Sequence, residues 1–368
     1  VYASDYDSAK DKYAVKVSLA DSDGTAVGTE QTNATGSFDN LEAGKYKITA
    51  TLSDGTTEKK KVEKTINIKN LDDMSAYLFV HFVDTQEDAT REQIYFSVSK
   101  DGKTWTTLNN KQPYLTSNVG TQGVRDPYIL RGEDGKFFII ATDLSVYNLK
   151  NNWTAAAQQG SKSIVVWESS DLVNWSEASL VKINNDNAGC TWAPEACYDP
   201  EKDEYMVFWA SVVSDDSYQK YRIYRSYTKD FKTFSAPELY IEEPNAVIDT
   251  TIIDHEGTYY RFTKNEAKSS ITMQECTSLS GDWKDVASYN LGSMTGYEGP
   301  TIYKLNGKNE WCLLIDYFSK SKGYKPFVTT DITKGEFTAD SDFSFDGTYR
   351  HGTVMPITQA EYESLTAE

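Results

Sequence analysis

A repeated unit across residues 71–368 constrains the fold more than any other feature of the sequence. The unit is a strand of alternating apolar and polar residues, followed by a Ser/Thr-Asp turn and an aromatic residue. Clear copies lie at Ile94–Trp105, Ile164–Trp175 and Arg222–Phe234, and weaker copies end at Trp283 and Phe337. Successive end points are 70, 59, 49 and 54 residues apart, which fits four-stranded blades with variable loops. The repeat predicts an all-β domain built from similar sheets.

A further strand pair precedes each of the last four copies. These pairs open with Arg125-Asp126-Pro127, Ala193-Pro194-Glu195, Ile248-Asp249-Thr250 and Glu298-Gly299-Pro300. The first copy lacks this opening strand, and a matching segment, Arg350–Pro356, stands near the end of the chain. If this segment pairs with the first strand, no sheet edge stays open. We therefore expect a five-bladed β-propeller closed by pairing of its N- and C-terminal strands.

Residues 1–70 have a different character. They contain no Trp, whereas all eight Trp lie beyond residue 100. Short alternating stretches at Tyr13–Leu19 and Gly44–Ala50 predict a small antiparallel β-sandwich. The stretch Thr35–Tyr46 resembles the immunoglobulin-like or prealbumin-like modules of bacterial extracellular proteins. We expect a sandwich over residues 1–70, acting as a spacer or stabilising module, and the propeller over residues 71–368.

The charge of the chain narrows the class of partner. The net charge is −18 at pH 7, and residues 71–368 carry −17 of it. Nucleic-acid binding rests on Lys and Arg that neutralise phosphates, so we expect no nucleic-acid partner. A neutral oligo- or polysaccharide suits an acidic protein better, although much of the charge serves solubility. No run approaches the roughly 18 uncharged apolar residues of a membrane helix, so no membrane span is expected.

The chain start and the cysteines bear on the compartment. The first residues show neither the basic nor the apolar region of a signal peptide, and we interpret the chain as a mature or trimmed form. We expect a secreted or cell-surface monomer of bacterial type. Four cysteines, Cys190, Cys197, Cys276 and Cys312, are too sparse for a disulfide scaffold or a zinc site. Cys190 and Cys197 could pair across a loop, but buried free thiols are favoured.

Ionisable residues stand at the heads of the predicted opening strands: Asp126, Glu195, Asp249, Glu298 and His351. The first strand of a propeller blade lines the central channel, so these heads should converge at one end. Repulsion and partial burial disfavour such a gathering of acids unless it has a function. Hydrolysis of a glycosidic bond needs an acid for the leaving oxygen and a second carboxylate, and a third can raise the pKa of the acid. The set predicts a glycoside hydrolase.

The ordered motifs, from Arg125-Asp126-Pro127 to Arg350-His351-Gly352, resemble glycoside hydrolase family 43 over nearly all of residues 76–357. Members are inverting five-bladed propellers that act mainly on α-L-arabinofuranosyl or β-D-xylosyl linkages, with a smaller group of exo-galactanases. The resemblance implies that Asp126 is the general base and Glu298 the general acid. It implies that Asp249 modulates the pKa of the acid and orients it. Inversion would separate base and acid by roughly 6.5–9.5 Å.

Three positions depart from the family pattern. Arg125 stands where many members have His, Glu195 where Asp is frequent, and Thr250 where Pro is frequent. These departures place the chain in an atypical branch and weaken the assignment of the sugar more than that of the mechanism. We still expect Glu195 to lie among the substrate-binding residues.

Other residues of the predicted site allow two interpretations each. The resemblance implies that His351 helps to hold a structural calcium or another cation, mostly through waters, and the alternative is a core histidine. Trp192 and Tyr297 could form an apolar wall for a sugar face or belong to the core. Arg125 and Arg350 could bind sugar hydroxyls or neutralise carboxylates, and neutralisation is favoured for Arg125. The segment 148–160, with Trp153, could form a pocket rim or a solvated insertion. No organic cofactor is expected.

We expect an exo-acting α-L-arabinofuranosidase for plant polysaccharide side chains or arabino-oligosaccharides. A β-xylosidase or an exo-β-1,3-galactanase is the alternative within the family, and a non-catalytic carbohydrate-binding propeller is the alternative of another class. A retaining fructosidase would need an Asn-Asp-Pro-Asn-Gly strand, which the sequence lacks. A sialidase would need repeated Ser-x-Asp-x-Gly-x-Thr-Trp boxes, and Ser99–Trp105 is one residue short of such a box.

Overall fold

β-Strands dominate the described part of the chain, as expected for an all-β protein. The structure is a computed structural model that describes residues 14–32, 38, 41, 44–68, 73–83 and 88–367. The chain divides into two units, Val1–Asp73 and Met74–Glu368.

The described residues of the first unit form one antiparallel sheet in the order β2-β1-β3-β4. Its strands are β1 (Ala14–Asp21), β2 (Ala26–Gln31), β3 (Gly44–Ser53) and β4 (Glu58–Ile68). Val15 and Leu19 on β1 and Tyr46 and Ala50 on β3 are buried, because alternate side chains of a strand share one face. The two-layered sandwich over residues 1–70 stays a prediction.

The described residues of the second unit form five sheets. Sheet 1 has the order β24-β7-β6-β5-β25 and contains β5 (Met74–Val83), β6 (Tyr95–Ser99), β7 (Thr104–Thr107), β24 (Ser344–Phe345) and β25 (Tyr349–Thr358). The other four sheets each take four consecutive strands. Sheet 2 contains β8 (Val124–Arg131), β9 (Phe137–Asp143), β10 (Ser163–Ser169) and β11 (Ser179–Lys182). Sheet 3 contains β12 (Trp192–Asp199), β13 (Glu204–Ser211), β14 (Arg222–Thr228) and β15 (Glu238–Ile241). Sheet 4 contains β16 (Val247–His255), β17 (Thr258–Asn265), β18 (Ser270–Cys276) and β19 (Lys284–Asp285). Sheet 5 contains β20 (Glu298–Lys304), β21 (Trp311–Asp316), β22 (Tyr324–Thr329) and β23 (Thr338–Ala339).

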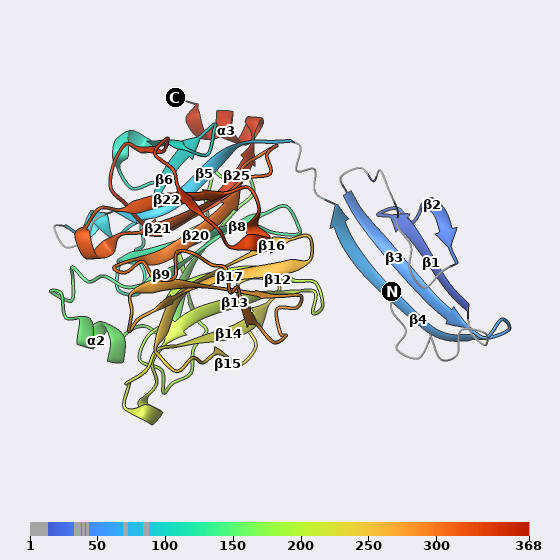
Figure 1. The fold of residues 1–368 in the computed structure, drawn as a ribbon, viewed down its shortest axis with the longest axis horizontal. Coiled ribbons are helices and arrows are strands. Elements are labelled where there is room, and N and C mark those ends of the chain that lie inside the picture. Colours follow the sequence, from blue (N-terminus) through green and yellow to red (C-terminus); the bar gives the residue numbers. More distant parts are fainter. Residues whose placement is uncertain are drawn as a thin grey trace. The chain divides into compact units, whose positions relative to one another are not determined.

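The two ends of the second unit meet in sheet 1. Strand β25 pairs antiparallel with β5, from Tyr349 opposite Val83 to Thr358 opposite Met74. In Figure 1 the red strand β25 lies beside the blue strand β5. The predicted pairing of the N-terminal and C-terminal strands is therefore present.

Helices are short in the described residues. The α-helices are α2 (Trp153–Gln158) and α3 (Gln359–Thr366), and the 3₁₀ turns are η2 (Ala89–Arg91), η3 (Asn109–Lys111), η4 (Ser214–Asp216), η5 (Phe318–Lys320) and η6 (Ile332–Lys334). Within the described ranges, no helix is long and apolar enough to span a membrane. All four cysteines are free thiols, so the alternative of a Cys190–Cys197 disulfide is wrong.

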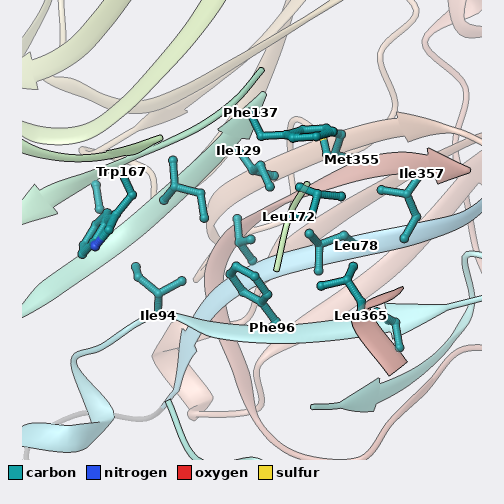
Figure 2. Close-up of a cluster of buried hydrophobic side chains, with 14 of the residues drawn as sticks. Leu78, Ile94, Phe96, Ile129, Phe137, Trp167, Leu172, Met355, Ile357 and Leu365 are labelled. Carbon is teal, nitrogen blue, oxygen red and sulfur yellow. The ribbon is translucent and has the colours of Figure 1, made fainter. Parts of the chain in front are cut away.

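Hydrophobic clusters join the five sheets in sequence. The cluster in Figure 2 combines Leu78, Phe96 and Ile357 of sheet 1 with Ile129 and Trp167 of sheet 2. Further clusters join sheet 2 to sheet 3, sheet 3 to sheet 4, sheet 4 to sheet 5, and sheet 5 to sheet 1. Each sheet of the second unit therefore buries apolar side chains against two other sheets, which fixes the positions of its strand heads.

Replacement of Ile357 tests this packing. Its side chain is completely buried, so Ile357→Ala should lower the free energy of unfolding by about 2–5 kcal/mol. The control is Leu239→Ala, which removes a side chain that is 47% exposed and should change the free energy by less than about 0.5 kcal/mol. Urea unfolding followed by Trp fluorescence reports on the second unit alone, because all eight Trp lie beyond residue 100. Equal losses in the two variants would contradict the packing described.

Candidate active site

Each of the strands β8, β12, β16, β20 and β25, which we call the opening strands, has a register shift at its head. The shifts fall between Arg125 and Tyr128, Trp192 and Glu195, Ile248 and Thr250, Glu298 and Thr301, and Arg350 and Gly352. In four of them one residue has a positive φ: Asp126 (50°), Ala193 (47°), Asp249 (51°) and Gly299 (52°). This backbone costs a non-glycine residue about 1–2 kcal/mol, and such strain concentrates at functional sites. The bulges re-aim the side chains at the strand heads.

The acids do not occupy equivalent positions in these bulges. Asp126 and Asp249 are themselves the residues with positive φ, whereas Glu298 precedes such a residue and Glu195 follows one by two positions. The acids therefore share the strand heads, as predicted, but they differ in their position within the bulge. Position 299 requires glycine, because the Cβ atom of any other residue would lie 2.7 Å from Cγ of His351 on β25.

His351 connects two of the acids. Its Nδ1 atom lies 3.3 Å from Asp126 Oδ1 and 3.9 Å from Asp249 Oδ1. Burial alone would lower the pKa of His351, but the nearby charges of Asp249, Asp126 and Glu195 raise it to about 9. His351 is therefore a buried cation at neutral pH, and the acids gather around it.

Asp126 is held in its ionised form. Its Oδ2 atom accepts a hydrogen bond of 2.9 Å from Thr142 Oγ1, which accepts one of 2.8 Å from the backbone N–H of Ala193. Burial raises the pKa of Asp126, but the hydrogen bond and charge of His351, the charge of Arg125 and the Thr142 bond together bring it below its usual value. A carboxylate that stays deprotonated can accept a proton from water.

Asp249 supports the backbone beside Glu298. It is 8% exposed, and its Oδ2 atom accepts a hydrogen bond of 3.1 Å from the N–H of Gly299, the residue after Glu298. Burial raises the pKa of Asp249 to about 6, although the charges of His351 and Lys264 oppose this rise. Asp249 therefore links the region of His351 to the strand that carries Glu298.

Glu298 forms ion pairs at both carboxylate oxygens. Lys264 Nζ lies 2.9 Å from Oε2, and Arg350 Nη2 lies 3.4 Å from Oε1. Arg350 Nε also lies 2.6 Å from Oδ2 of Asp316, which is completely buried. Burial raises the pKa of Asp316 to about 6, although the charge of Arg350 opposes this. Lys264 and Asp316 were not predicted from the sequence, because they lie on the second strands of their sheets.

Glu195 is more buried than the other acids at the strand heads. It is 4% exposed, and its Oε2 atom has no hydrogen-bond partner among the described residues. Burial raises the pKa of Glu195 to about 8, although the charge of His351 opposes this. Glu195 is therefore a neutral acid at pH 7, and its burial favours a place in the charge network over contact with substrate.

Arg125 is neutralised by a buried acid, as the sequence favoured. Its Nη1 atom lies 3.0 Å from Oε1 of Glu92, which is completely buried and also accepts the backbone N–H groups of residues 146 and 147. The guanidinium carbon lies 4.6 Å from the ring centroid of Phe82 and 5.3 Å from that of Trp153. Glu92 was not singled out in the sequence, since it lies 33 residues from Arg125.

The structure distinguishes the two interpretations of Trp192 and Tyr297, an aromatic wall or a place in the core. Trp192 is half-buried, stacks on Tyr221 at 5.4 Å between centroids, and meets Trp153 edge-on at 6.2 Å. Trp153, the first residue of α2, is 42% exposed. Tyr297 is 8% exposed, stacks on Tyr317 at 4.4 Å, and belongs to the core between sheets 4 and 5. The aromatic surface open to solvent beside Arg125 is therefore that of Trp153.

The residues around His351 do not fit a cation as direct ligands. The Nδ1 atom of His351 already faces two carboxylates, Asp126 at 3.3 Å and Asp249 at 3.9 Å. Over the described residues, no three His, Cys, Asp or Glu side chains are arranged as a metal site. The structural calcium or other cation, held mostly through waters, stays a prediction, and we derive no catalytic step through it.

Comparisons with known proteins identify the class of enzyme. The family model described as "Probable glycosyl hydrolase domain", related to glycoside hydrolase family 43, matches residues 72–363. An α-L-arabinofuranosidase of Bifidobacterium longum subsp. longum is 30% identical over 345 residues, with 80% of this chain and 32% of that protein covered. The chain thus spans about a third of the length of that curated relative.

Solved structures are more distant. The catalytic domain of a family 62 α-L-arabinofuranosidase from Coprinopsis cinerea is 16% identical, with 62% of this chain and 71% of that chain covered and a TM-score of 0.44. An exo-β-1,3-galactanase from Phanerochaete chrysosporium is 18% identical, with 61% and 53% covered and a TM-score of 0.45. We draw no conclusion about the substrate from structures with TM-scores below 0.5.

Substitution of Glu195 tests its protonation state. Folded Glu195 keeps its proton up to pH about 8, whereas the unfolded residue loses it near 4.5, so the stabilisation is complete below pH 4.5 and is lost as the pH rises through 8. We expect Glu195→Gln to flatten the decline of the unfolding free energy between pH 5 and pH 8 by up to about 1.4 kcal/mol per pH unit. Urea unfolding at several pH values, in the presence of a chelator, measures this. Parallel pH dependences of the variant and the wild type would show that Glu195 is ionised in the folded protein.

Proposed function

The chain belongs to the glycosyl hydrolases related to family 43, and from this premise we propose that it is an inverting, exo-acting α-L-arabinofuranosidase. The cluster of Asp126, His351 and Asp249, connected through Gly299 to Glu298, is the observation that carries the hydrolytic mechanism. The name of the Bifidobacterium longum relative supports the arabinofuranosyl specificity. We further propose that the substrate is a neutral plant polysaccharide or arabino-oligosaccharide met outside the cell, which suits the net charge of −18.

Asp126, Glu298 and Asp249 have different roles in the proposed reaction. Asp126, held as a carboxylate, accepts a proton from the attacking water while the water oxygen bonds to the anomeric carbon. Glu298 takes up a proton before the reaction and gives it to the glycosidic oxygen as the bond to the leaving sugar breaks. Asp249 fixes the backbone beside Glu298 through the Gly299 N–H and adds a neighbouring negative charge. Because water and leaving group occupy opposite faces of the sugar, the anomeric configuration inverts.

We also propose that the five sheets of the second unit close into a five-bladed ring. The opening strands contact one another in the order β8, β12, β16, β20 and β25, and β25 contacts β8 again. The hydrophobic clusters follow the same cyclic order, since sheet 5 shares one with sheet 1. A ring of this kind brings the five strand heads to one end of a common axis, which is the arrangement that the mechanism requires.

Variants of Asp126 and Glu298 test the two roles. The substrates are aryl α-L-arabinofuranoside, β-D-xyloside and β-D-galactoside, together with arabinan, arabinoxylan and arabinogalactan. We expect hydrolysis of the arabinofuranosides, and a fall of about 10²–10⁴-fold in kcat on all of them for Asp126→Asn. Glu298→Gln should lose a similar factor on oligosaccharides but much less on an aryl glycoside with a strongly acidic phenol, which leaves without protonation.

The control for these variants is Asp199→Asn. Asp199 is 2% exposed and ends β12, the far end of that strand from the bulge. Its substitution should leave kcat unchanged within about twofold. An equal loss of kcat in Asp126→Asn, Glu298→Gln and Asp199→Asn would show that the substitutions act through folding. Cleavage of xylosides or galactosides alone would contradict the sugar proposed, and binding without cleavage of any substrate would favour a non-catalytic propeller.

Trp153 provides a test of substrate contact. Its ring stands beside Arg125 and is 42% exposed, so it can pack against the face of a sugar ring. We expect Trp153→Ala to lower kcat/KM on arabinoxylan by about tenfold. Tyr147 lies in the same connection between β9 and β10 and is 41% exposed, but within the described residues it has no ring contact with Trp192 or Arg125. Tyr147→Ala should therefore have an effect of less than about twofold, and equal losses would exclude a specific contact of Trp153.

A further inference from the structure

Lys264 is a buried cation that the mechanism above leaves without a role. It lies near the end of β17, opposite Ile248 of β16, and its side chain is 4% exposed. Its Nζ atom lies 2.9 Å from Glu298 Oε2 and 3.0 Å from Glu266 Oε1, and 4.5 Å from the ring centroid of Phe318. Lysine is almost never buried to this extent unless it is paired. The partner at the shorter distance is the proposed general acid.

The charge of Lys264 is permanent at the pH at which the enzyme would work. Burial alone would lower the pKa of Lys264, but the charges of Glu298, Asp249 and Glu266 raise it well above its usual value. Lys264 therefore neither supplies nor accepts a proton during turnover. Its effect on the reaction must be electrostatic and geometric.

Lys264 is also the closer of the two cations that flank Glu298. Arg350 Nη2 lies 3.4 Å from Oε1 of Glu298, and the Nε atom of Arg350 is held by Asp316 at 2.6 Å. Lys264 Nζ approaches Oε2 to 2.9 Å. The short contact on Oε2 fixes the rotation of the carboxyl group, so Lys264 determines how Glu298 faces a bound substrate.

The attraction between Lys264 and Glu298 changes during proton donation. When Glu298 gives its proton to the glycosidic oxygen, a carboxylate forms next to the ammonium group. The ammonium group of Lys264 attracts the ionised form of Glu298 more strongly than it attracts the protonated form. The attraction between the two residues therefore grows from the ground state to the transition state. Interactions of this kind raise the rate, and they are strong in a site with little water.

We propose that Lys264 is a positioning residue for Glu298, which orients the carboxyl group and stabilises the carboxylate left by proton donation. This inference rests on the proposed role of Glu298 as the general acid. It explains why the chain buries a lysine here, where an apolar side chain would avoid the cost of desolvating a charge. The effect of Lys264 should therefore depend on how much a leaving group needs protonation.

The test compares Lys264→Met, Lys264→Arg and Lys103→Met on two substrates, an arabino-oligosaccharide and an aryl arabinofuranoside with a strongly acidic phenol. Lys103 is the matched control, because its Nζ atom also lies between two carboxylates, 3.1 Å from Glu310 and 2.6 Å from Asp340, outside the candidate site. We expect Lys264→Met to lower kcat on the oligosaccharide by about 10²-fold and on the aryl substrate by less than about threefold. Lys264→Arg should restore a large part of the loss, and Lys103→Met should leave both rates unchanged.

A double variant isolates the interaction itself. In the Glu298→Gln background no carboxylate forms, so Lys264→Met should cause no further loss on the oligosaccharide. Equal loss on both substrates, or the same loss with and without Glu298, would overturn the proposal. Should Lys264→Met not fold, Lys264→Arg carries the test, with a smaller loss confined to the oligosaccharide. If the wild type cleaves no glycoside, the proposed function fails; if it does and Lys264→Met behaves like Lys103→Met, only the role of Lys264 fails.

Discussion

Several carboxyl groups can share the buried centre of the second unit only because cations are built in beside them. His351 lies within 3.3 Å of Asp126 and 3.9 Å of Asp249, and Glu298 is bracketed by Lys264 and Arg350. Without these partners the cost of burying the charges would force the acids to take up protons or would unfold the strand heads. The same arrangement gives chemically similar side chains different protonation states. The pKa of Asp126 lies below its usual value, which suits a general base, while that of Asp249 is raised to about 6.

Much of this organisation can be predicted from the sequence, because repeats reveal where strands begin. The periodic pattern located the opening strands, and the absence of an opening strand in the first copy led to the pairing of β25 with β5. It also brought Asp126, Asp249 and Glu298 together with His351. The sequence repeat does not predict which way each side chain points at the bulges. A residue in the left-handed conformation shifts the following side chains by one position, and it leaves the alternation of apolar and polar residues along the strand unchanged. For this reason the sequence predicts Glu195 among the substrate-binding residues, whereas its side chain, two positions after the left-handed Ala193, is buried.

The strand heads alone do not reveal the supporting residues, because these residues lie on the second strands of the sheets. Antiparallel pairing places the end of each second strand opposite the head of the first. Thr142 lies opposite Arg125, Lys264 opposite Ile248, and Asp316 opposite Glu298. In β9 and β21, which are otherwise mostly apolar, a polar residue near the end of the strand is therefore a signal in the sequence, whereas β17 holds several other polar residues and Lys264 does not stand out. Glu92 is different, because its contact with Arg125 depends on the course of a long connection that no local pattern reveals.

Asp126 and Glu298 can act as base and acid only from opposite faces of the bound sugar, and the stereochemistry of the first product reports on this directly. Proton NMR of an α-L-arabinofuranoside, recorded within the first minutes after addition of enzyme and before mutarotation, distinguishes the two anomers of the released sugar. An inverting displacement yields β-L-arabinofuranose as the first product. Initial release of the α-anomer would mean that one of the carboxylates attacks the sugar itself, and it would contradict the roles assigned to both residues.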